Sequence, residues 1–227
     1  MAALLTKESG LLRAVVKGAR GRSKRAAALQ LLTEVAVTLY RREGQELARV
    51  ESIEIARSSF VLACRPESAM LLPYIAETIA TFVPDSEPGG EVYRLTRLVL
   101  DALEAGVEAL LVTRYFEVWM LRFAGLLPEG RTCAVCGEPL GAGPVRLDPE
   151  IPGFACAACA GRGSIPVARQ SLALLKEIRR TKLTEWPGLG SGVLREDLEE
   201  IESLTREVRR RFLGHELKSH RFLRSLF

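Results

Sequence analysis

Apolar and polar residues alternate in three short stretches near the start of the chain, between Leu11 and about Arg57. These stretches read LLRAVVKG, TEVAVTLYR and ELARVESIEIAR, and Gly-rich or charged turns separate them. Alternation with a period of two, together with β-branched residues, indicates half-buried strands. The pattern therefore predicts a small β-domain over residues 1–62.

The periodicity changes at Arg65-Pro66, because the residue before a proline resists helix while proline suits a first helical turn. From there on, apolar residues recur at spacings of three and four, which is typical of amphipathic helices. A helix is predicted from Pro66 to Pro84, and Gly106 is expected to divide the next apolar stretch. Later helices are predicted to begin at Ser164-Ile165-Pro166 and to run as one stretch from Arg195. The chain thus reads as an α+β protein with a helical domain over residues 63–227.

Four cysteines interrupt this helical domain within residues 131–163. They form two C-x2-C pairs separated by 19 residues, namely Cys133, Cys136, Cys156 and Cys159. Each pair can form a tight knuckle, and two knuckles give the four thiolates of a closed tetrahedral zinc site. The spacing predicts one structural zinc ion in an inserted zinc ribbon, with a short strand pair around VRLDPEIPGFAC. A disulfide framework is the alternative, and a reducing cytoplasm disfavours it.

Composition is that of an ordinary globular protein, with 48% hydrophobic and 26% charged residues in 227. No apolar run is long enough for a membrane span, and residues 1–10 contain no secretion signal. A cytoplasmic location is expected. The fifth cysteine, Cys64, has apolar neighbours and is predicted to be a buried, inert thiol. Tyr115, Phe116, Trp119 and Phe123 recur at helical spacing, which favours core packing.

Positive charge is concentrated in one segment of the predicted β-domain, although the net charge is only +4. Six basic residues occur there with no acid among them: Arg13, Lys17, Arg20, Arg22, Lys24 and Arg25. A cationic loop with two glycines can follow phosphates and gain affinity by counterion release. The alternative is a solvated connecting loop. Tyr40 and Phe60 are the aromatic residues of this region, so limited base stacking is expected.

Two further basic groups occur in the helical region. Arg179, Arg180 and Lys182 end the helix after the cysteines, and a longer series follows in the last helical region: Arg206, Arg209, Arg210, Arg211, Lys218, Arg221 and Arg224. Cations near a helix C-terminus also favour the helix dipole. These groups are therefore equally compatible with DNA contact and with a solvated face.

Enzyme motifs are absent from the sequence, which is interpreted as that of a non-enzyme. No nucleotide-binding G-x-x-x-x-G-K-[ST] motif occurs, and the glycines of GLGSG at 188–192 follow no strand. His215-Glu216 with His220 resembles H-E-x-x-H, but the histidines are five residues apart rather than four. On a helix they would not share the face that a catalytic zinc site needs.

Taken together, the order of parts and several stretches resemble the RecO family of bacterial recombination mediators. The matching stretches are GLLRAVVKGARGRSKRAAALQLLTEVAVTLY, RYFEVWMLRFAGLLPEGRTCAVCGEPL, FACAACAGRG and FLGHELKSHRFLRSLF. The resemblance implies an N-terminal OB-fold barrel, a helical domain with a zinc ribbon, and the four cysteines as zinc ligands. It also assigns Lys17, Arg20, Arg22, Lys24 and Arg25 to the family's basic loop.

The resemblance further implies binding to single- and double-stranded DNA, annealing of complementary strands, and help in loading RecA. RecR and the C-terminal tail of single-stranded-DNA-binding protein are the implied protein partners. Family members have one more strand before the point matching ALLTKESGLLRAV, so the first barrel strand is expected to be missing, since an OB barrel has about five. A zinc-ribbon module that only recruits other proteins is the alternative function.

Overall fold

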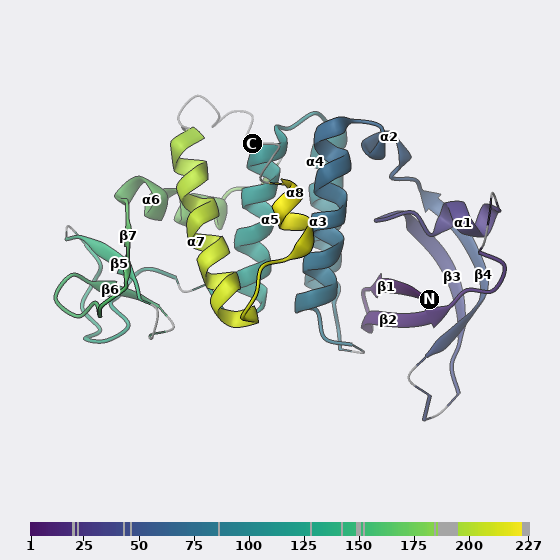
Figure 1. Cartoon of the computed structure of the whole chain (residues 1–227), viewed down its shortest axis with the longest axis horizontal. Coiled ribbons are helices and arrows are strands. Elements are labelled where there is room, and N and C mark those ends of the chain that lie inside the picture. Colours follow the sequence, from purple (N-terminus) through teal and green to yellow (C-terminus); the bar gives the residue numbers. More distant parts are fainter. Residues whose placement is uncertain are drawn as a thin grey trace. The chain divides into compact units, whose positions relative to one another are not determined.

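The structure is a computed structural model that describes residues 1–19, 21, 23–42, 44–45, 47–85, 87–127, 129–141, 143–148, 151, 153–183, 185 and 195–223. It contains two compact units (Figure 1). One comprises Met1–Ala109 with Leu217–Phe227, and the other comprises Leu110–Glu216. We call them the N-terminal unit and the ribbon unit. Strands and helices occur in both, so the predicted α+β class is confirmed.

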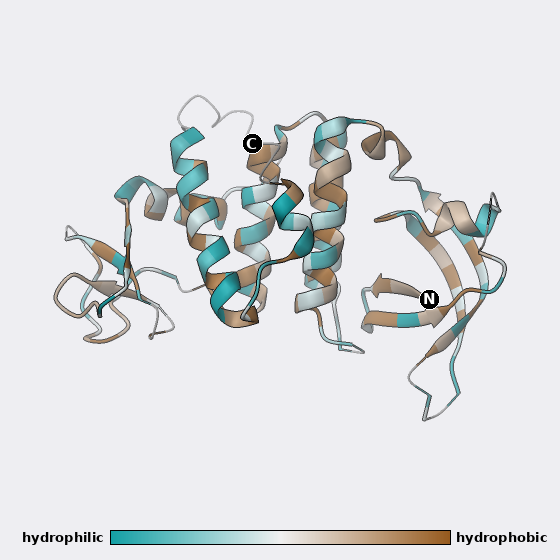
Figure 2. Ribbon diagram, in the orientation of Figure 1, coloured by the Kyte–Doolittle hydropathy of each residue, from teal (hydrophilic) through white to brown (hydrophobic). Residues whose placement is uncertain are grey.

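The sheet of the N-terminal unit has the strand order β1-β2-β4-β3. Its strands are β1 (Ala2–Thr6), β2 (Gly10–Val15), β3 (Glu34–Tyr40) and β4 (Ala48–Arg57). β2 and β4 pair in parallel, whereas β1 with β2 and β3 with β4 are antiparallel. Hydrophobic and hydrophilic residues alternate along β3 and β4 (Figure 2), as half-buried strands require. The three predicted strands are confirmed, and β1 is additional.

The inner face of the sheet packs around a small apolar core. Ala14, Ala48 and Val50 are buried, and Leu4, Val37 and Leu39 pack against them. Leu4 lies on β1 and Leu39 on β3, so both edge strands contribute to one core. The sheet therefore curls around its core, as in an OB-like fold. The predicted absence of a further strand stays a prediction.

Two short helices accompany the sheet, and the first begins within the predicted basic loop. α1 (Lys24–Ala28) begins at Ser23, whose hydroxyl accepts a hydrogen bond from the Ala26 amide at 3.1 Å. α2 (Phe60–Ala63) ends at Cys64, which is exposed. The prediction of a buried Cys64 is therefore wrong. In this short helix Leu62 points inward, whereas Phe60 and Val61 remain exposed.

Three longer helices complete the N-terminal unit: α3 (Pro66–Phe82), α4 (Gly90–Glu104) and α8 (Lys218–Leu223). The carboxylate of Glu77 on α3 accepts hydrogen bonds from the amides of Lys218 (3.1 Å) and Ser219 (2.8 Å). His220 packs on Tyr74 with 5.6 Å between ring centroids. α8 is thus bound to α3 by both a polar cap and an aromatic contact.

Helices α5 (Ala109–Phe123), α6 (Arg169–Ile178) and α7 (Arg195–Leu213) form the helical part of the ribbon unit. Gly106, with φ +83°, separates α4 from α5, as predicted. Tyr115 and Phe116 are buried, which confirms their predicted core role. The predicted single C-terminal helix is wrong, because Gly214 (φ +73°) ends the run and α8 is a separate helix.

A second sheet of three strands, in the order β6-β5-β7, carries the cysteines. Its strands are β5 (Val145–Leu147), β6 (Phe154–Cys156) and β7 (Ile165–Val167). The predicted strand pair is confirmed, but the helix predicted to begin at Ser164 begins instead at Arg169. Residues 165–167 pair with β5, so strand pairing overrides the local capping signal.

The two compact units divide the helices differently from the sequence-based domains. α3, α4 and α8 group with the first sheet, whereas α5, α6 and α7 group with the cysteine-bearing sheet. The boundaries at residues 62 and 63 and at 131–163 stay predictions. The GLGSG segment at 188–192 lies outside the described residues. Within the described part of the chain, no helix has the length and apolar character needed to cross a bilayer.

Candidate metal centre and cationic surfaces

The four predicted zinc ligands meet at one point of the ribbon unit. Their sulfur atoms all lie within 4.8 Å of one another. In the first knuckle the Gly137 amide donates to the Cys133 carbonyl at 2.9 Å, and Gly137 has φ +75°. In the second the Ala160 amide donates to the Cys156 carbonyl at 3.0 Å. Of the His, Cys, Asp and Glu side chains in the described residues, these four cysteines form a cluster that could hold a metal ion.

Neighbouring groups shift the pKa values of the thiols in the cluster in opposite directions. Backbone N–H groups of Cys136, Cys156 and Val135 lower the pKa of the Cys133 thiol to about 6. Hydrogen bonds with Cys156 and then Cys136 raise the pKa of Cys159 to about 12, because these bonds favour the protonated thiol. Four thiolates at about 2.3 Å from one zinc ion would be about 3.8 Å apart. The observed spacing accommodates this arrangement.

The ribbon is held against the helices of its own unit. Arg211 on α7 donates to the Asp148 carbonyl at 2.8 Å, and the Gly161 amide donates to the Asp148 carboxylate at 2.6 Å. At Gly130 (φ +65°), an added Cβ would lie 3.2 Å from the Phe154 ring. The site is therefore closed by four cysteines and tied to helix α7, as in a structural metal centre.

The basic segment of the β-region contains residues with different partners. Lys17 and Lys24 are exposed and form no ion pair with a described residue. Arg13 pairs with Asp85 at 2.9 Å. Arg20 and Arg22, which are predicted DNA contacts, lie outside the described residues. Lys17 and Lys24 are therefore the described cations of this segment that are most available to a ligand.

Arg25 has a structural partner on each side. Its two Nη atoms donate to the carbonyl oxygens of Lys17 at 2.8 Å and Glu51 at 3.0 Å. These bonds connect α1, the start of the loop after β2, and strand β4. Arg25 thus positions the cationic segment beside the sheet, whatever else it contacts.

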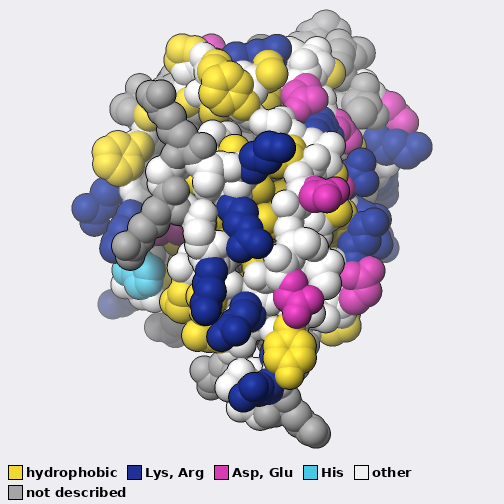
Figure 3. Space-filling view, turned by 90° about the vertical axis from the view of Figure 1, so that its right-hand side faces the viewer, with side chains coloured by type: hydrophobic (Ala, Val, Ile, Leu, Met, Phe, Trp, Pro, Cys, Tyr) yellow, Lys and Arg dark blue, Asp and Glu magenta, His cyan; other side chains and the backbone are white. Residues whose placement is uncertain are grey.

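Figure 3 shows the sheet-bearing face of the molecule. Lys and Arg side chains form a band down the middle of this face, and several Asp and Glu side chains lie to one side of it. A linear band of cations fits a phosphate backbone better than an isolated cation would. Which of the two interpretations holds for the basic segment, phosphate binding or a solvated loop, stays a prediction.

Arg179 belongs to a second cationic group in the ribbon unit. We call Arg122, Arg131, Arg179 and Arg180 the Arg179 cluster. Arg179 donates to the Glu129 carbonyl at 3.1 Å, and Arg131 pairs with the Glu129 carboxylate at 3.0 Å. Burial, followed by the positive charge of Arg122, lowers the pKa of Arg179. The cluster therefore has more positive than negative charge.

An aromatic ring adjoins this cluster. The Arg122 guanidinium lies 5.1 Å from the centroid of the Trp119 ring, and the Trp119 indole donates to the Ile178 carbonyl at 3.3 Å. Lys182, the third predicted contact of this group, is exposed and 3.9 Å from the Glu185 carboxylate. The sequence signal for Arg179 and Arg180 did not reveal Arg122 and Arg131, because these lie about 50 residues earlier in the chain.

Several terminal cations have internal partners. The side chains of Arg209 and Glu117 are 2% and 1% exposed and lie 3.6 Å apart. Arg206 pairs with Glu216 at 2.8 Å, and Glu207 binds Arg210 and Arg211. These arginines stabilise the fold, which agrees with the structural interpretation of this group. Arg224 lies outside the described residues.

Glu216 and the two histidines do not form a metal site. Glu216 accepts hydrogen bonds from Arg206 and Arg209, and His220 is buried against Tyr74. His215 is exposed. The H-E-x-x-H-like sequence therefore has structural roles in the described part of the chain.

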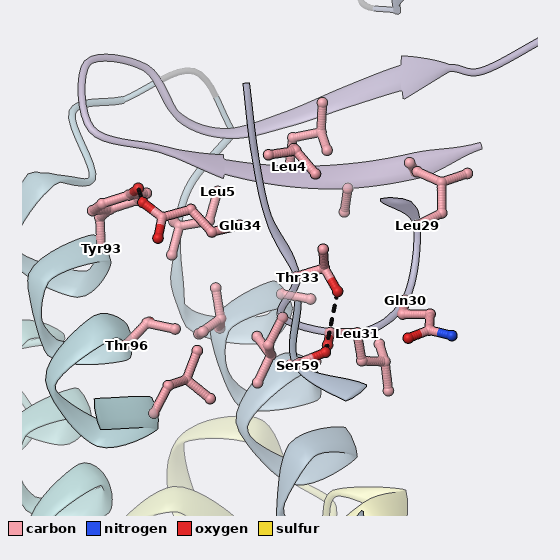
Figure 4. A pocket seen from close by; sticks show the side chains of 18 of the residues that line it. Leu4, Leu5, Leu29, Gln30, Leu31, Thr33, Glu34, Ser59, Tyr93 and Thr96 are labelled. Carbon is pink, nitrogen blue, oxygen red and sulfur yellow. Dashed lines mark hydrogen bonds between the residues drawn. The ribbon is translucent and has the colours of Figure 1, made fainter. Parts of the chain in front are cut away.

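A cavity of about 1300 Å³ opens within the N-terminal unit (Figure 4). Apolar side chains such as Leu4, Leu5, Leu29 and Leu31 line it, and the Thr33 and Ser59 hydroxyls share a 3.1 Å hydrogen bond at its wall. Residues of both edge strands, β1 and β3, border it. The cavity therefore marks the side on which the sheet is open, and nothing in the described residues shows what covers it.

Comparison with known proteins gives consistent matches. Residues 1–59 match the family model "Recombination protein O N terminal", and residues 66–221 match "Recombination protein O C terminal". A "DNA repair protein RecO" of Anaeromyxobacter sp. (strain K) is 35% identical over 179 residues, which are 78% of this chain and 70% of the relative. A protein of the same name from Koribacter versatilis is 34% identical over 186 residues, or 82% and 75% of the two chains. A third, from Dehalococcoides mccartyi, is 28% identical over 225 residues, or 98% and 87%.

Proposed function

Since this chain belongs to the recombination protein O family and hence acts in DNA repair and recombination, we propose that it is an ATP-independent mediator. It binds single- and double-stranded DNA, anneals complementary strands and helps RecR to load RecA. The observation that carries this proposal is the basic segment of the β-region, in which Lys17 and Lys24 are exposed and form no ion pair with a described residue. A band of Lys and Arg side chains on the sheet-bearing face supports it (Figure 3). The site of action would be the cytoplasm, at the nucleoid.

The mechanism follows from charge. Two DNA strands repel each other through their phosphates, and fixed cations that replace their counterions reduce that repulsion. Complementary bases can then meet without an energy source. This is binding and annealing rather than catalysis, which agrees with the interpretation of the sequence as a non-enzyme.

An annealing assay tests this function directly. Complementary oligonucleotides are mixed without ATP, with single-stranded-DNA-binding protein added or withheld, and wild type is expected to accelerate annealing. Lys17→Ala/Lys24→Ala is expected to weaken binding to all sequences alike and to lower the salt slope of log Kd by about two, one for each phosphate contact.

The double variant Arg162→Ala/Arg169→Ala is a matched control, because it removes the same charge from exposed positions of the ribbon unit, outside the basic segment of the β-region. It is expected to bind and anneal like wild type. Absence of any DNA binding by wild type at low salt, with normal capture of protein partners, would instead establish the recruitment module.

One zinc ion is proposed as a structural cofactor. Cys133, Cys136, Cys156 and Cys159 would hold it, and when bound it would offset part of the negative charge of four converging thiolates. This chain supplies the rest: the knuckle amides orient the sulfur atoms, and the contact between Arg211 and Asp148 anchors the ribbon. The proposed metal role is therefore stability rather than chemistry.

The acidic C-terminal tail of single-stranded-DNA-binding protein is proposed to dock at the Arg179 cluster. Exposed guanidinium groups of Arg122, Arg131 and Arg180 suit carboxylates, and the neighbouring Trp119 ring suits an apolar side chain. The predicted DNA contacts Arg179 and Arg180 belong to this cluster, so DNA and the tail would compete there. No surface is proposed for RecR.

Fluorescence anisotropy with a labelled tail peptide tests this docking. Arg122→Ala/Arg180→Ala is expected to weaken binding at least about tenfold, because the loss of even one charge-assisted hydrogen bond of roughly 1.5–3 kcal/mol has that effect. The Arg162→Ala/Arg169→Ala control should bind normally. Equal affinity of both variants would place the tail elsewhere.

A further inference from the structure

A second, smaller pocket opens on the sheet of the N-terminal unit. It has a volume of about 540 Å³, and its lining includes Val15, Tyr40, Arg42, Gln45, Leu47 and Arg49. We call it the Tyr40 pocket. Its volume falls within the range of small-molecule sites, and it combines one aromatic ring with two guanidinium groups.

Strand register places the key residues in one row. Tyr40 on β3 is opposite Arg49 on β4, and Arg49 is opposite Val15 on β2. Side chains at such paired positions point to the same face of a sheet. The preceding residues Leu39 and Ala48 belong to the inner core, so the row faces outward. Tyr40 is accordingly 52% exposed.

The described lining residues give the pocket a positive charge. Arg42 and Arg49 form no ion pair with any described residue, and no described carboxylate lines the pocket. An unpaired guanidinium beside an exposed ring is suited to a ligand that is both planar and anionic. A nucleotide of single-stranded DNA has this chemistry.

The pocket also adjoins the cationic segment. Within strand β4, Arg49 lies two residues before Glu51. The carbonyl of Glu51 accepts a hydrogen bond from Arg25, which also donates to the Lys17 carbonyl. Two residues of a strand span about 7 Å, which is close to the length of one nucleotide of an extended strand. One DNA strand can thus contact Lys17 and the Tyr40 pocket at once.

We propose that the Tyr40 pocket binds one unstacked base of single-stranded DNA on the Tyr40 ring, with flanking phosphates at Arg42 and Arg49. In a duplex both faces of each base are covered by neighbouring bases, so only a single strand can fill the pocket. The pocket therefore makes the protein prefer single strands to duplex. This inference rests on the proposed DNA-binding function and adds a determinant of strand preference that cations alone do not supply.

Binding of three probes by fluorescence anisotropy at fixed low salt tests the inference. The probes are an oligothymidylate, an abasic oligonucleotide of the same length, and a duplex. Wild type is expected to prefer oligothymidylate to the abasic strand about tenfold, the size of one base–aromatic stack. Tyr40→Ala is expected to abolish this preference, and Tyr40→Phe is expected to keep it. Duplex affinity should be unchanged in both variants.

Arg49→Gln is the second variant, with circular dichroism and melting checks on all three. It is expected to weaken binding of oligothymidylate and of the abasic strand to the same extent, which leaves the ratio of their affinities unchanged.

If Tyr40→Ala keeps the wild-type preference for bases, the inference is wrong while DNA binding stands. If wild type binds no probe, the proposed function itself fails. Tyr40-dependent competition by polyglutamate, without a preference for bases, would identify an acidic peptide as the occupant and overturn the inference.

Discussion

At the scale of single residues, cations that look alike in the sequence have different environments in the structure. Lys17 and Lys24 are exposed, Arg25 is bound to two backbone carbonyls, and Arg209 is buried beside Glu117. Only exposed cations such as Lys17 and Lys24 can pair with an anionic ligand without disrupting the fold. Residue type alone therefore does not identify a DNA contact.

The buried network around Glu117 makes a residue-level prediction. Its carboxylate lies 2.5 Å from Arg114 and 3.6 Å from Arg209, and it accepts a hydrogen bond from the Thr205 hydroxyl at 3.0 Å. Glu117→Gln would remove the counter-charge of the buried Arg114 guanidinium and leave Arg209 with Glu216 alone, so we expect a loss of about 3–5 kcal/mol in the free energy of unfolding. Urea denaturation measures this.

Glu185→Gln is the control for that experiment. Glu185 forms an exposed pair with Lys182 at 3.9 Å, and its loss should cost less than about 1 kcal/mol. If the two variants unfolded at the same urea concentration, the Glu117 network would not stabilise the fold.

At the scale of secondary-structure elements, termini depend on partners elsewhere in the chain. α8 has only six residues, and Glu77 on α3 binds its first amides. Burial by itself would raise the pKa of Glu77, but hydrogen bonds from Ser219 and Lys218 outweigh it and lower the pKa. A carboxylate 141 residues away in the sequence therefore serves as the cap of this helix.

The depressed pKa of Glu77 gives a pH prediction. The stabilisation is present above the unfolded-state pKa of about 4.3, and it is lost as pH falls through the lower folded-state pKa. Glu77→Gln is expected to cost about 1 kcal/mol at neutral pH and to be equivalent to wild type at low pH. Urea melts across the acid range measure this difference.

Glu108→Gln provides the comparison, because Glu108 is exposed and has no partner among the described residues. It should melt like wild type at every pH. A Glu77→Gln deficit that persists unchanged below the carboxylate range would mean that the effect is packing rather than charge.

At the scale of the whole molecule, stability is divided between two compact units, and the cysteine cluster belongs to one of them. The three ribbon strands have three residues each, so they bury little apolar surface of their own. The proposed metal would supply the support that so small an apolar core lacks. The consequence of metal loss should therefore be confined to the ribbon and its neighbours.

Removal of the metal tests this division. Chelation, or Cys133→Ser, is expected to lower the melting temperature, to reduce the free energy of unfolding by more than about 2 kcal/mol, and to raise hydrogen exchange in residues 131–167. Peptides from β1 to β4 should keep their protection. Cys64→Ser is the matched control, because Cys64 lies outside the cluster. A Cys133→Ser variant that melts like wild type with one zinc still bound would contradict the structural role.

The sequence by itself was sufficient for features set by short-range pattern. Period-two alternation located β2, β3 and β4, and Gly106 separated two helices because its φ of +83° is accessible mainly to glycine. The C-x2-C spacing located the four cysteines because each knuckle is a local structure. These features depend on residues close together in the chain.

Tertiary structure decided what depends on distant residues. Pairing with β5 made a strand of residues 165–167 despite a helix-start signal, and the cluster of Arg122 and Arg179 forms because a helix end lies beside Trp119. The row of Val15, Arg49 and Tyr40 arises only from the register of three strands. Long-range pairing brings such residues together, and local propensity contains no information about which residues will pair.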